Sequence, residues 1–499
     1  MAAIWVLACL SASLPLQVNA QLHYWQEQPL QQQDDTSPCD TLSATFPAQV
    51  SAPREKSYRE SQSTYWTAQQ AELTPDCRFY PRNARDIAEA LADIILPQNV
   101  SIAVASGRHS SSTGASNINH GITIDLAQLN QVRLADKNSA VYIGPGARWE
   151  DVYTLLEPHN LTVSGGRAAH VGVGGYVLGG GLSWFANEHG WTCDSVLDFQ
   201  VVTPQGQVLW ATKHYNDDIF YALKGSLGAV GIVTQIKLPT ISNSVVYAGA
   251  LSYSSGSFEI SQLFDALHTL GNSAKTEPEQ SGYLSFAWLE AKKEFEYTAY
   301  LLNTEGDTDL VQPFTSIPHK ASSLRRTTIG SSAKEISASN PPGQRRTKFT
   351  LTSRSSTEAM SAIHDTIKSF TTKLKFDQDD ILGTTFQPLT VPHLQAQSNI
   401  FNLDAHQGPL LLIMVEICWT DASKDEYFEI SAQTLRVALE QELKALSAHH
   451  PFIYPNYAAR DQDPFSSQTI PMLSLLKAIK KKYDPESLWH TLLPGIWHV

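Results

Sequence analysis

Residues 165–184 read GGRAAHVGVGGYVLGGGLSW and form the most glycine-rich stretch of the chain. Such a composition disfavours both helix and strand, because glycine loses the most backbone entropy on folding and has no side chain to pack. It suits a backbone that lies directly against a large flat ligand or its pyrophosphate. Val171, Val173 and Trp184 alternate with the glycines and would anchor the turn in a core, which argues against a flexible linker. The stretch therefore predicts a cofactor cradle.

Three further glycine-containing turns accompany this stretch. Residues 105–126, ASGRHSSSTGASNINHGITIDL, follow a buried strand predicted at 101–105, and their small residues would let backbone N–H groups converge on an anion. Residues 143–148 read IGPGAR, and residues 217–234, DDIFYALKGSLGAVGIVT, lead from a glycine turn into a β-branched strand. Each turn alone is weak evidence, so the prediction depends on their order and spacing.

Together these strings resemble the PCMH-type FAD-binding domain of the vanillyl-alcohol-oxidase class, specifically the berberine-bridge-enzyme-like oxidoreductases and above all their fungal members. The resemblance extends to PFIYPNYAARDQDP at 451–464 and KKYDPESLWHTLLPG at 481–495. It implies an α+β fold with a two-subdomain FAD-binding domain at 73–244. A substrate domain at 245–450, with an antiparallel sheet covered by helices, would follow, and residues 451–499 would return to the FAD-binding domain.

The resemblance also implies how FAD is held. His109 matches the histidine that is bonded to the flavin 8α-methyl group, and Ala168 stands where some members have a second, cysteine link, so the FAD is expected to be mono-covalent. The role of His170 stays open: it could touch the flavin or the substrate, or simply fill space. The cofactor-binding residues implied are Ser106, Gly107, Arg108, His109, Ser110 and Gly114 in the first turn, Gly172, Gly174 and Gly175 at the pyrophosphate, Gly179, Gly180, Gly181 and Tyr457 along the ring, and Ile232 and Val233 near the adenine.

Two residues are candidates for the catalytic base that takes the O–H proton when an alcohol is oxidised. Tyr454 belongs to a Tyr-x-Asn-Tyr string, whose first tyrosine has this role in some sugar-oxidising relatives, and a phenol needs a depressed pKa to act near neutrality. Glu416 lies in the apolar strand 411–417, where a charge is costly unless it is paired or lines a cavity; the alternative is an edge position facing solvent. We rank Tyr454 first and Glu416 second.

The activity implied by the resemblance is that of an FAD-linked oxidase, which passes hydride from a small molecule (a secondary-metabolite alcohol, amine or ring C–H) to flavin and then electrons to O2. An oligosaccharide oxidase, a dehydrogenase with another acceptor and a non-catalytic secreted flavoprotein are the alternatives. No metal site is predicted, because His449-His450 lacks cysteine or carboxylate partners at ligand spacing. The glycine runs also lack the strand–GxGxxG–helix unit of nicotinamide enzymes.

The N-terminus predicts a secreted protein. Residues 1–20 are typical of a signal peptide, with an apolar segment and a small-residue cleavage pattern at 18–20; a buried helix is the alternative. Residues 21–72 are polar and are expected to form an irregular leader. The four cysteines that remain allow three pairings; we predict a Cys39–Cys77 disulfide, with Cys193 and Cys418 as buried thiols, and the sequons at Asn99 and Asn160 would be glycosylated.

Charge and composition limit the partners. The formal net charge of −13 repels nucleic acid and leaves no basic patch for an anionic membrane, and no later stretch approaches the roughly 20 apolar residues of a membrane helix. We therefore expect a monomer whose partners are a small-molecule substrate and O2. Residues 315–357, rich in Ser, Thr, Arg and Pro, are predicted to be a loop, either a lid over the pocket or a solvated surface segment.

Overall fold

The protein was analysed as a computed structural model that describes residues 37–242, 245–306, 311–395, 398–404, 406 and 408–499. The predicted signal peptide and the first residues of the leader lie outside this part. Helices and strands from both halves of the chain form one compact unit, Pro38–Val499, and the predicted α+β fold is confirmed.

The glycine-rich half of the chain (38–242) contains two sheets. The first sheet has the strand order β1-β2-β4-β3. It consists of β1 (Val50–Ser51), β2 (Cys77–Phe79), β4 (Ile122–Asp125) and β3 (Ile102–Ala105). The strands of the second, antiparallel sheet are β5 (Val132–Ala135), β6 (Ala140–Ile143), β10 (Ile232–Pro239), β8 (Asp198–Val202) and β9 (Val208–Thr212). A small pair joins β7 (Leu161–Thr162) to β11 (Ile241–Ser242). The turns that precede and follow these strands carry the glycine motifs.

Helices connect and cover these sheets. They are α1 (Pro38–Thr45), α2 (Lys56–Gln62), α3 (Ala68–Ala71), α4 (Ala84–Ala90), α5 (Trp149–Leu156), α6 (Val173–Leu178), α7 (Ala186–His189) and α8 (Asp217–Leu223). Helix α4 begins after Asn83, because the Asn83 side chain accepts hydrogen bonds from the N–H groups of Arg85 and Asp86 at 2.9 and 3.1 Å. The prediction of an irregular leader is wrong for its described part, which contains α1, α2, α3 and β1. Polar composition hid these short helices.

The second half (245–450) is built on one large antiparallel sheet, in the order β15-β12-β14-β13-β18-β19-β17-β20, with β16 beside β12. Its strands are β12 (Val245–Ser254), β13 (Gln280–Leu289), β14 (Glu294–Asn303), β15 (Ala321–Ser322), β16 (Arg325–Thr328), β17 (Arg345–Arg354), β18 (Ile381–Leu389), β19 (Leu410–Trp419) and β20 (His449–His450). Its helices are α9 (Ile260–Ser273), α10 (Gln312–Thr315), α11 (Ile329–Ala338), α12 (Thr357–Thr371), α13 (Val391–Gln395) and α14 (Asp425–Ala445).

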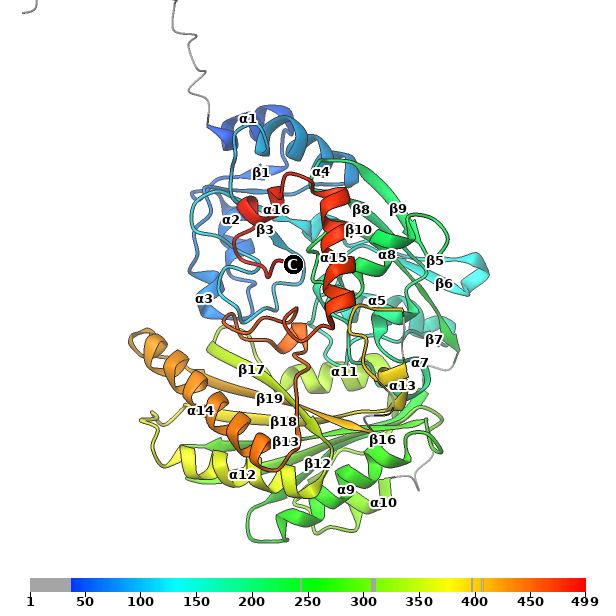
Figure 1. The fold of residues 1–499 in the computed structure, drawn as a ribbon, viewed down its shortest axis with the longest axis vertical. Helices are drawn as coiled ribbons and strands as arrows, with labels where there is room; N and C mark the ends of the chain where they lie inside the picture. The colour runs from blue at the N-terminus through cyan, green and yellow to red at the C-terminus, as the bar shows by residue number, and fades with distance from the viewer. Residues whose placement is uncertain (1–36, 243–244, 307–310, 396–397, 405, 407) are drawn as a thin grey trace, which may run out of the picture. The chain divides into compact units, whose positions relative to one another are not determined.

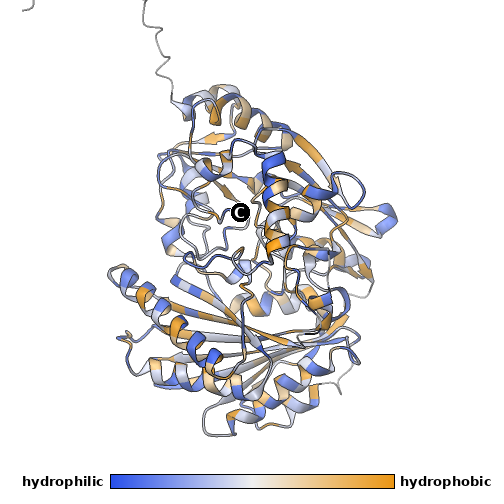
Figure 2. Ribbon diagram, viewed as in Figure 1, coloured by the Kyte–Doolittle hydropathy of each residue, from blue (hydrophilic) through white to orange (hydrophobic). Residues whose placement is uncertain are grey.

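The two faces of this sheet have different neighbours. Helices α9, α12 and α14 cover one face, and the glycine-rich half lies on the other (Figure 1). Hydrophobic and hydrophilic residues alternate along α14, whose apolar side is buried on the sheet (Figure 2). Because side chains alternate across a strand, Phe349 and Leu351 of β17 pack in the helix-covered core while Arg346 and Lys348 line a cavity on the opposite face.

The prediction of a loop at 315–357 is wrong. This region contains β16, α11 and β17, and β17 pairs with β19 along its whole length, from Arg345 opposite Trp419 to Arg354 opposite Leu410. The segment Asn340-Pro341-Pro342-Gly343 is the connection between α11 and β17. The Ser, Thr and Arg residues that indicated a loop lie instead on a strand whose cavity face is polar.

The C-terminal segment returns to the glycine-rich half through α15 (Ile470–Tyr483) and α16 (Leu488–Leu492), drawn in red in Figure 1. Lys482 forms a 2.6 Å ion pair with Asp218, and the Trp489 indole N–H donates to the carbonyl oxygen of Gly228 at 3.2 Å. Residues far apart in the sequence therefore close one end of the glycine-rich half.

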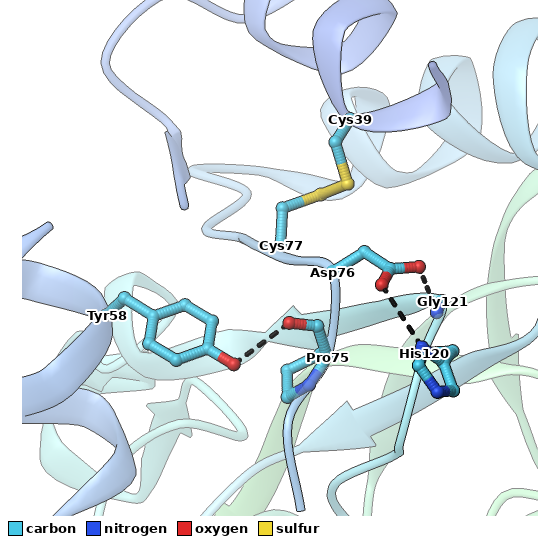
Figure 3. The surroundings of a disulfide bond; sticks show 7 residues. All are labelled: Cys39, Tyr58, Pro75, Asp76, Cys77, His120 and Gly121. Carbon is cyan, nitrogen blue, oxygen red and sulfur yellow. Dashed lines mark hydrogen bonds and ion pairs between the residues drawn. A yellow bond between two sulfur atoms is a disulfide. The ribbon is translucent and has the colours of Figure 1, made fainter. Parts of the chain in front are cut away.

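A disulfide joins Cys39 of α1 to Cys77 of β2, the pair chosen from the sequence, with their Cα atoms 5.9 Å apart (Figure 3). Beside it, the Asp76 carboxylate accepts a hydrogen bond from the N–H of Gly121 and pairs with His120 at 3.6 Å. Cys193 and Cys418 are buried free thiols. Within the described ranges, we find no helix with the length and apolar character needed to cross a membrane.

Candidate active site

A cavity of about 680 Å³ lies between the glycine turns and the face of the large sheet opposite its helices. Its volume is in the range of pockets that hold cofactors and substrates. The lining comes from the turns at 104–116, 166–178 and 227–233, from strands β13, β14, β17, β18 and β19, and from the C-terminal segments 454–458 and 489–497. Of the predicted site residues, those that line it are Ser106, Gly107, Arg108, His109, Ser110, Gly172, Gly174, Gly175, Ile232, Val233, Glu416, Tyr454 and Tyr457.

Two glycine turns meet at the bottom of this cavity. A Cβ atom on Gly107 would lie 2.2 Å from the Cα of Gly172, and one on Gly172 would lie 2.3 Å from the Cα of Gly107. Contact this close requires glycine at both positions. A Cβ on Gly175 would meet no atom within 4 Å, because Gly175 faces the open cavity. The two backbones therefore present a bare surface to a ligand, which is what FAD requires of its cradle.

Side chains of the first turn hold the turn itself. The Ser106 hydroxyl donates to the carbonyl oxygen of Pro145 at 2.5 Å. Arg108, whose φ of 57° is left-handed, forms a 2.5 Å ion pair with the buried Asp125. Burial opposes the charge of Arg108, but Asp125 outweighs burial and raises the pKa of the guanidinium. These side chains fix the loop so that its backbone can meet a ligand.

Four glycines assigned to the cofactor from the sequence do not line the cavity. A Cβ on Gly179 would lie 2.1 Å from the Asn456 side chain, and one on Gly180 would lie 2.8 Å from the Phe401 ring. Gly181 likewise faces Tyr176, and Gly114 packs against Arg460 and Gly495. The predicted ring contact of Gly179, Gly180 and Gly181 is therefore corrected: they pack against protein side chains behind the cavity wall.

His109 is held in a stack of three rings. Its imidazole lies 4.1 Å from the Trp66 ring, at an interplanar angle of 16°, and 4.6 Å from the His170 ring, at 29°. The Nε2 atoms of both histidines are buried and have no hydrogen-bond partner in the described part of the chain. Burial lowers the pKa of His109 well below its usual value, and the charges of Lys348 and Arg346 act in the same direction. His109 is therefore a neutral imidazole at pH 7.

His170, whose role the sequence left open, is a half-buried residue beside the attachment point expected for the flavin. Burial, together with Arg148 and Arg346, lowers the pKa of His170 to about 4. Its backbone carbonyl accepts a hydrogen bond from Arg148 at 2.6 Å, and its N–H donates to Ser337 at 3.2 Å. These contacts fix the ring against His109 as a neutral stacking partner.

The environment of Tyr454 does not fit a catalytic base. The phenol is only 1% exposed, and its oxygen accepts hydrogen bonds from the Gly181 N–H at 3.0 Å and the Asn456 side chain at 3.2 Å. Burial raises the pKa of Tyr454 well above its usual value, whereas the predicted role requires a depressed one. We therefore correct the ranking: Tyr454 supports the turn at Gly181, and its burial favours the neutral phenol over the phenolate that the predicted role requires.

Glu416 lies on the cavity face of β19, and its carboxylate pairs with Arg346 of β17 at 3.2 Å. Arg346 is almost fully buried. It also donates to Asn340 at 2.7 Å and to the Pro341 carbonyl oxygen at 2.6 Å, and it packs over the Trp66 ring at 4.2 Å. Glu416 therefore meets both conditions under which a charge is tolerated in an apolar strand: it is paired, and it lines a cavity.

Two more cations line the cavity near Tyr457. Arg167 donates to the Gln387 side chain and, at 3.4 Å, to the Tyr457 hydroxyl, and its guanidinium lies 4.5 Å from the Tyr283 ring centroid. The Lys348 ammonium lies 5.5 Å from the Tyr457 ring centroid. Sequence reasoning missed Trp66, Arg167, Arg346 and Lys348. Of these four residues, only Arg167 had a signal in the sequence, because it directly follows Gly166 in the glycine-rich stretch.

Comparison with known proteins identifies the group that fits this cradle. The FAD binding domain family matches residues 75–212. The FAD-dependent monooxygenase tpcD of Cochliobolus heterostrophus is 31% identical, over 92% of this chain and 93% of its own. The FAD-dependent monooxygenase prx3 of Penicillium roqueforti is 30% identical, over 92% of each chain.

The chain belongs to the PCMH-type FAD-dependent oxidoreductases. Solved oxidases share the fold of this oxidoreductase at low sequence identity. The glucooligosaccharide oxidase of Acremonium strictum, which carries 6-S-cysteinyl, 8α-N1-histidyl FAD, superposes with a TM-score of 0.74 at 21% identity, covering 91% of this chain and 98% of its own. The 6-hydroxy-D-nicotine oxidase of Arthrobacter nicotinovorans gives 0.74 at 17% identity, covering 89% and 96%.

FAD is therefore the cofactor of this oxidoreductase. The glycine contact at Gly107 and Gly172 and the buried, unpartnered Nε2 of His109 are the features of this chain that fit FAD. Bound there, FAD would accept a hydride from the substrate. The glycine turns and His109 would hold the cofactor, and the strands of the large sheet would line the space left for a substrate.

Proposed function

We propose that this oxidoreductase is an oxidase that carries FAD on one covalent bond to His109 and passes electrons from a small organic substrate to O2. The observation that carries the proposal is the neutral His109 ring, held between Trp66 and His170 with its Nε2 unpartnered beside the cavity. Only an unprotonated imidazole nitrogen has the lone pair that forms a bond to carbon.

The atoms and electrons of the linkage reaction balance when His109 reacts as a neutral imidazole. The new bond joins an imidazole nitrogen of His109 to the 8α-methyl carbon, and the methyl group and the ring N–H each lose one hydrogen. The two electrons released are taken by O2, which the proposed activity already uses and which becomes hydrogen peroxide. Burial, aided by the charges of Lys348 and Arg346, lowers the pKa of His109 and so favours the neutral, reactive form of the ring.

A single bond is favoured over a double one. Ala168 lines the cavity two residues after Gly166 and has no nucleophilic atom. A second, sulfur-based link of the kind found in the glucooligosaccharide oxidase therefore has no donor at this position. His109 is left as the attachment point.

Transfer of electrons to O2 is supported by the names of the proteins that this chain resembles. Its similar sequences are FAD-dependent monooxygenases and its similar structures are oxidases, so O2 is the acceptor that these names share. On the glycine side, Gly175 lines the cavity and a Cβ there would meet no atom within 4 Å, so the cavity has open space at this position.

We also propose that the protein is secreted and glycosylated and acts as a monomer. Cys39 and Cys77 form a disulfide, a bond that persists in oxidising compartments. Asn99 and Asn160, the acceptors of the two sequons, are both exposed at turns. Expression in a eukaryotic host, with glycosidase digestion of the secreted protein and measurement of its mass in solution, tests all three points.

The covalent bond is tested on secreted wild-type protein and the His109→Ala variant, with His120→Ala as a control because His120 is an exposed histidine of the same loop. After acid precipitation, we expect flavin fluorescence to stay with the wild-type and control proteins and to be absent from His109→Ala. Flavin released from wild-type protein by acid would refute the link, and protein purified without flavin would refute the cofactor itself.

The acceptor is tested without knowing the substrate. Flavin reduced anaerobically with light and EDTA is mixed with O2 in a stopped-flow instrument. We expect complete reoxidation within seconds, with formation of hydrogen peroxide. Reoxidation that takes many minutes would identify a dehydrogenase with a different acceptor.

A further inference from the structure

We propose that the substrate carries an oxyanion, either a carboxylate or an ionised phenol, which binds between Arg167 and Lys348. The inference rests on the proposed function, because it concerns the substrate end of the same cavity. It specifies the charge of the molecule that is oxidised.

The first argument is the charge balance of the cavity wall. Four basic side chains and one carboxylate line the cavity: Arg108, Arg167, Arg346, Lys348 and Glu416. Arg108 is paired with Asp125 behind the wall, and Arg346 is paired with Glu416. Arg167 and Lys348 form no ion pair within 4.0 Å among the residues that the structure describes, although Glu416, the partner of Arg346, lies opposite Lys348 in the β17–β19 register. A buried cation without a counterion is costly, so a ligand anion is expected to complete the pair.

Lys348 is aimed into the cavity from the middle of β17. Its side chain is 9% exposed, and its ammonium donates no hydrogen bond to any described residue. The nearest aromatic faces are Trp66, at 5.6 Å, and Tyr457, at 5.5 Å. Burial lowers the pKa of Lys348 to about 8; Glu416 opposes this shift and Arg346 adds to it. The three donors of the ammonium are therefore available to a bound ligand.

Arg167 is held in place but keeps most of its donors. Only its Nη2 atom is engaged, by Gln387 and by the Tyr457 hydroxyl at 3.4 Å. The guanidinium packs over Tyr283 and Trp184, with its carbon 4.5 and 5.6 Å from the ring centroids. An arginine has five N–H donors in a planar fork that matches a carboxylate. The unused donors of Arg167 are thus fixed in direction before any ligand arrives.

Both cations lie beside Tyr457. Arg167 lies at its hydroxyl, and Lys348 lies near its ring. An oxyanion placed beside Tyr457 would contact both, while its organic part would extend along the sheet over Ser285, Thr385 and Met414, which line the cavity there. An ionised phenol also needs no protein base to remove its proton, which agrees with the high pKa that burial gives Tyr454.

The anion that competes with this proposal is the cofactor itself, because reduced flavin is negatively charged. If Arg167 and Lys348 stabilise the negative charge of reduced flavin, they should also raise the affinity of oxidised flavin for sulfite, since the flavin–sulfite adduct is anionic too. Cations that serve the substrate would instead raise the affinity for ligand anions relative to neutral molecules of the same shape. The two roles therefore have different readouts, and neither requires the natural substrate.

The experiment uses the flavin-loaded protein and follows the visible flavin spectrum during titration with benzoate and with benzamide, a neutral molecule of the same shape. We expect benzoate to bind about tenfold or more tightly than benzamide, as charge-assisted hydrogen bonds to two cations imply. Lys348→Met and Arg167→Gln are each expected to lose about tenfold in benzoate affinity with little change for benzamide. Lys373→Met, on an exposed lysine outside the cavity, is the matched control.

The outcomes separate the alternatives. Equal binding of benzoate and benzamide to the wild-type protein overturns the inference and needs no variant. A loss of sulfite affinity in Lys348→Met without any preference for benzoate assigns the cations to the flavin and also overturns it. Lys348→Arg keeps the charge and should keep the preference, so loss through misfolding is distinguished from loss of charge. Absence of flavin would refute the proposed function instead.

Discussion

Trp66 stacks on His109, with the ring centroids 4.1 Å apart and the ring planes 16° apart. Trp66 comes from the segment before the glycine motifs, and its backbone N–H donates to the carbonyl oxygen of Arg108 at 3.1 Å. The residue that orients the proposed flavin attachment point therefore lies outside the cradle itself, in a part of the chain whose composition is polar and uninformative.

The first prediction concerns this stack. Trp66→Leu removes an aromatic contact worth about 0.5–1.5 kcal/mol, so we expect covalent attachment of FAD to slow by a factor of about 2 to 10. The measurement is the time course of acid-stable flavin after apoprotein is mixed with FAD. Trp210→Leu, on an exposed strand position, should leave the rate unchanged. An unchanged rate in Trp66→Leu would show that the stack does not orient His109.

The second prediction separates two glycines of the cradle. Gly107→Ala brings a Cβ to 2.2 Å from the Gly172 backbone, so it should cost about 1–3 kcal/mol of folding free energy as well as flavin. Gly175→Ala meets no protein atom within 4 Å, so it should leave the apoprotein as stable as wild type and weaken only FAD binding. Urea unfolding and FAD titration of the apoproteins measure the two effects. Equal destabilisation by both changes would contradict the cradle geometry.

Sequence reasoning located the elements whose patterns are local. The apolar strand expected at 411–417 lies within β19, and the buried strand expected at 101–105 is β3. In contrast, β17 was read as a loop, because its cavity face carries Arg346 and Lys348 and its polarity masks the period-two alternation. Local composition cannot show that a strand faces a polar cavity, since that depends on what packs against it.

The same limit of local composition applies to the active site. Glycine density correctly indicated close backbone contact, but it could not tell contact with a ligand from contact with protein. Gly172 lies at the cavity, whereas Gly179 and Gly180 accommodate Asn456 and Phe401. These partners come from segments more than 200 residues later in the chain. Only the folded chain brings the glycines and their partners together.

The third prediction concerns the ion pair of Arg346 and Glu416. Arg346→Met leaves the Glu416 carboxylate without its partner and removes the hydrogen bonds to Asn340 and Pro341. We expect unfolding free energy to fall by about 3–5 kcal/mol. The double variant Arg346→Met, Glu416→Gln should recover part of this loss, because no unpaired charge remains. Purely additive effects in urea unfolding would show that the two side chains are not coupled.

The fourth prediction concerns the disulfide. Cys39 and Cys77 are 38 positions apart, and closing a loop of that length restricts the unfolded chain enough to stabilise the fold by about 3–4 kcal/mol. The Cys39→Ala, Cys77→Ala variant should therefore unfold at a lower urea concentration than wild type and be secreted in smaller amounts. Cys418→Ala, which removes a buried free thiol instead, is the comparison for loss of a cysteine alone. Equal stability of wild type and the double variant would contradict this assignment.

The last prediction is the pH dependence of anion binding. The groups that face Lys348 are Arg346, Glu416, His109 and Tyr457, and burial lowers the pKa of the lysine to about 8. Below this pH the ammonium is charged and attracts benzoate; above it the charge is lost. Benzoate affinity should thus be constant at neutral pH and fall above pH 8, approaching about tenfold per pH unit, until Arg167 alone holds the anion. Lys348→Arg, which stays charged, should flatten the profile, and benzamide should show no such dependence in either protein. A wild-type profile that stays flat to pH 10 would place the charge of Lys348 outside the anion site.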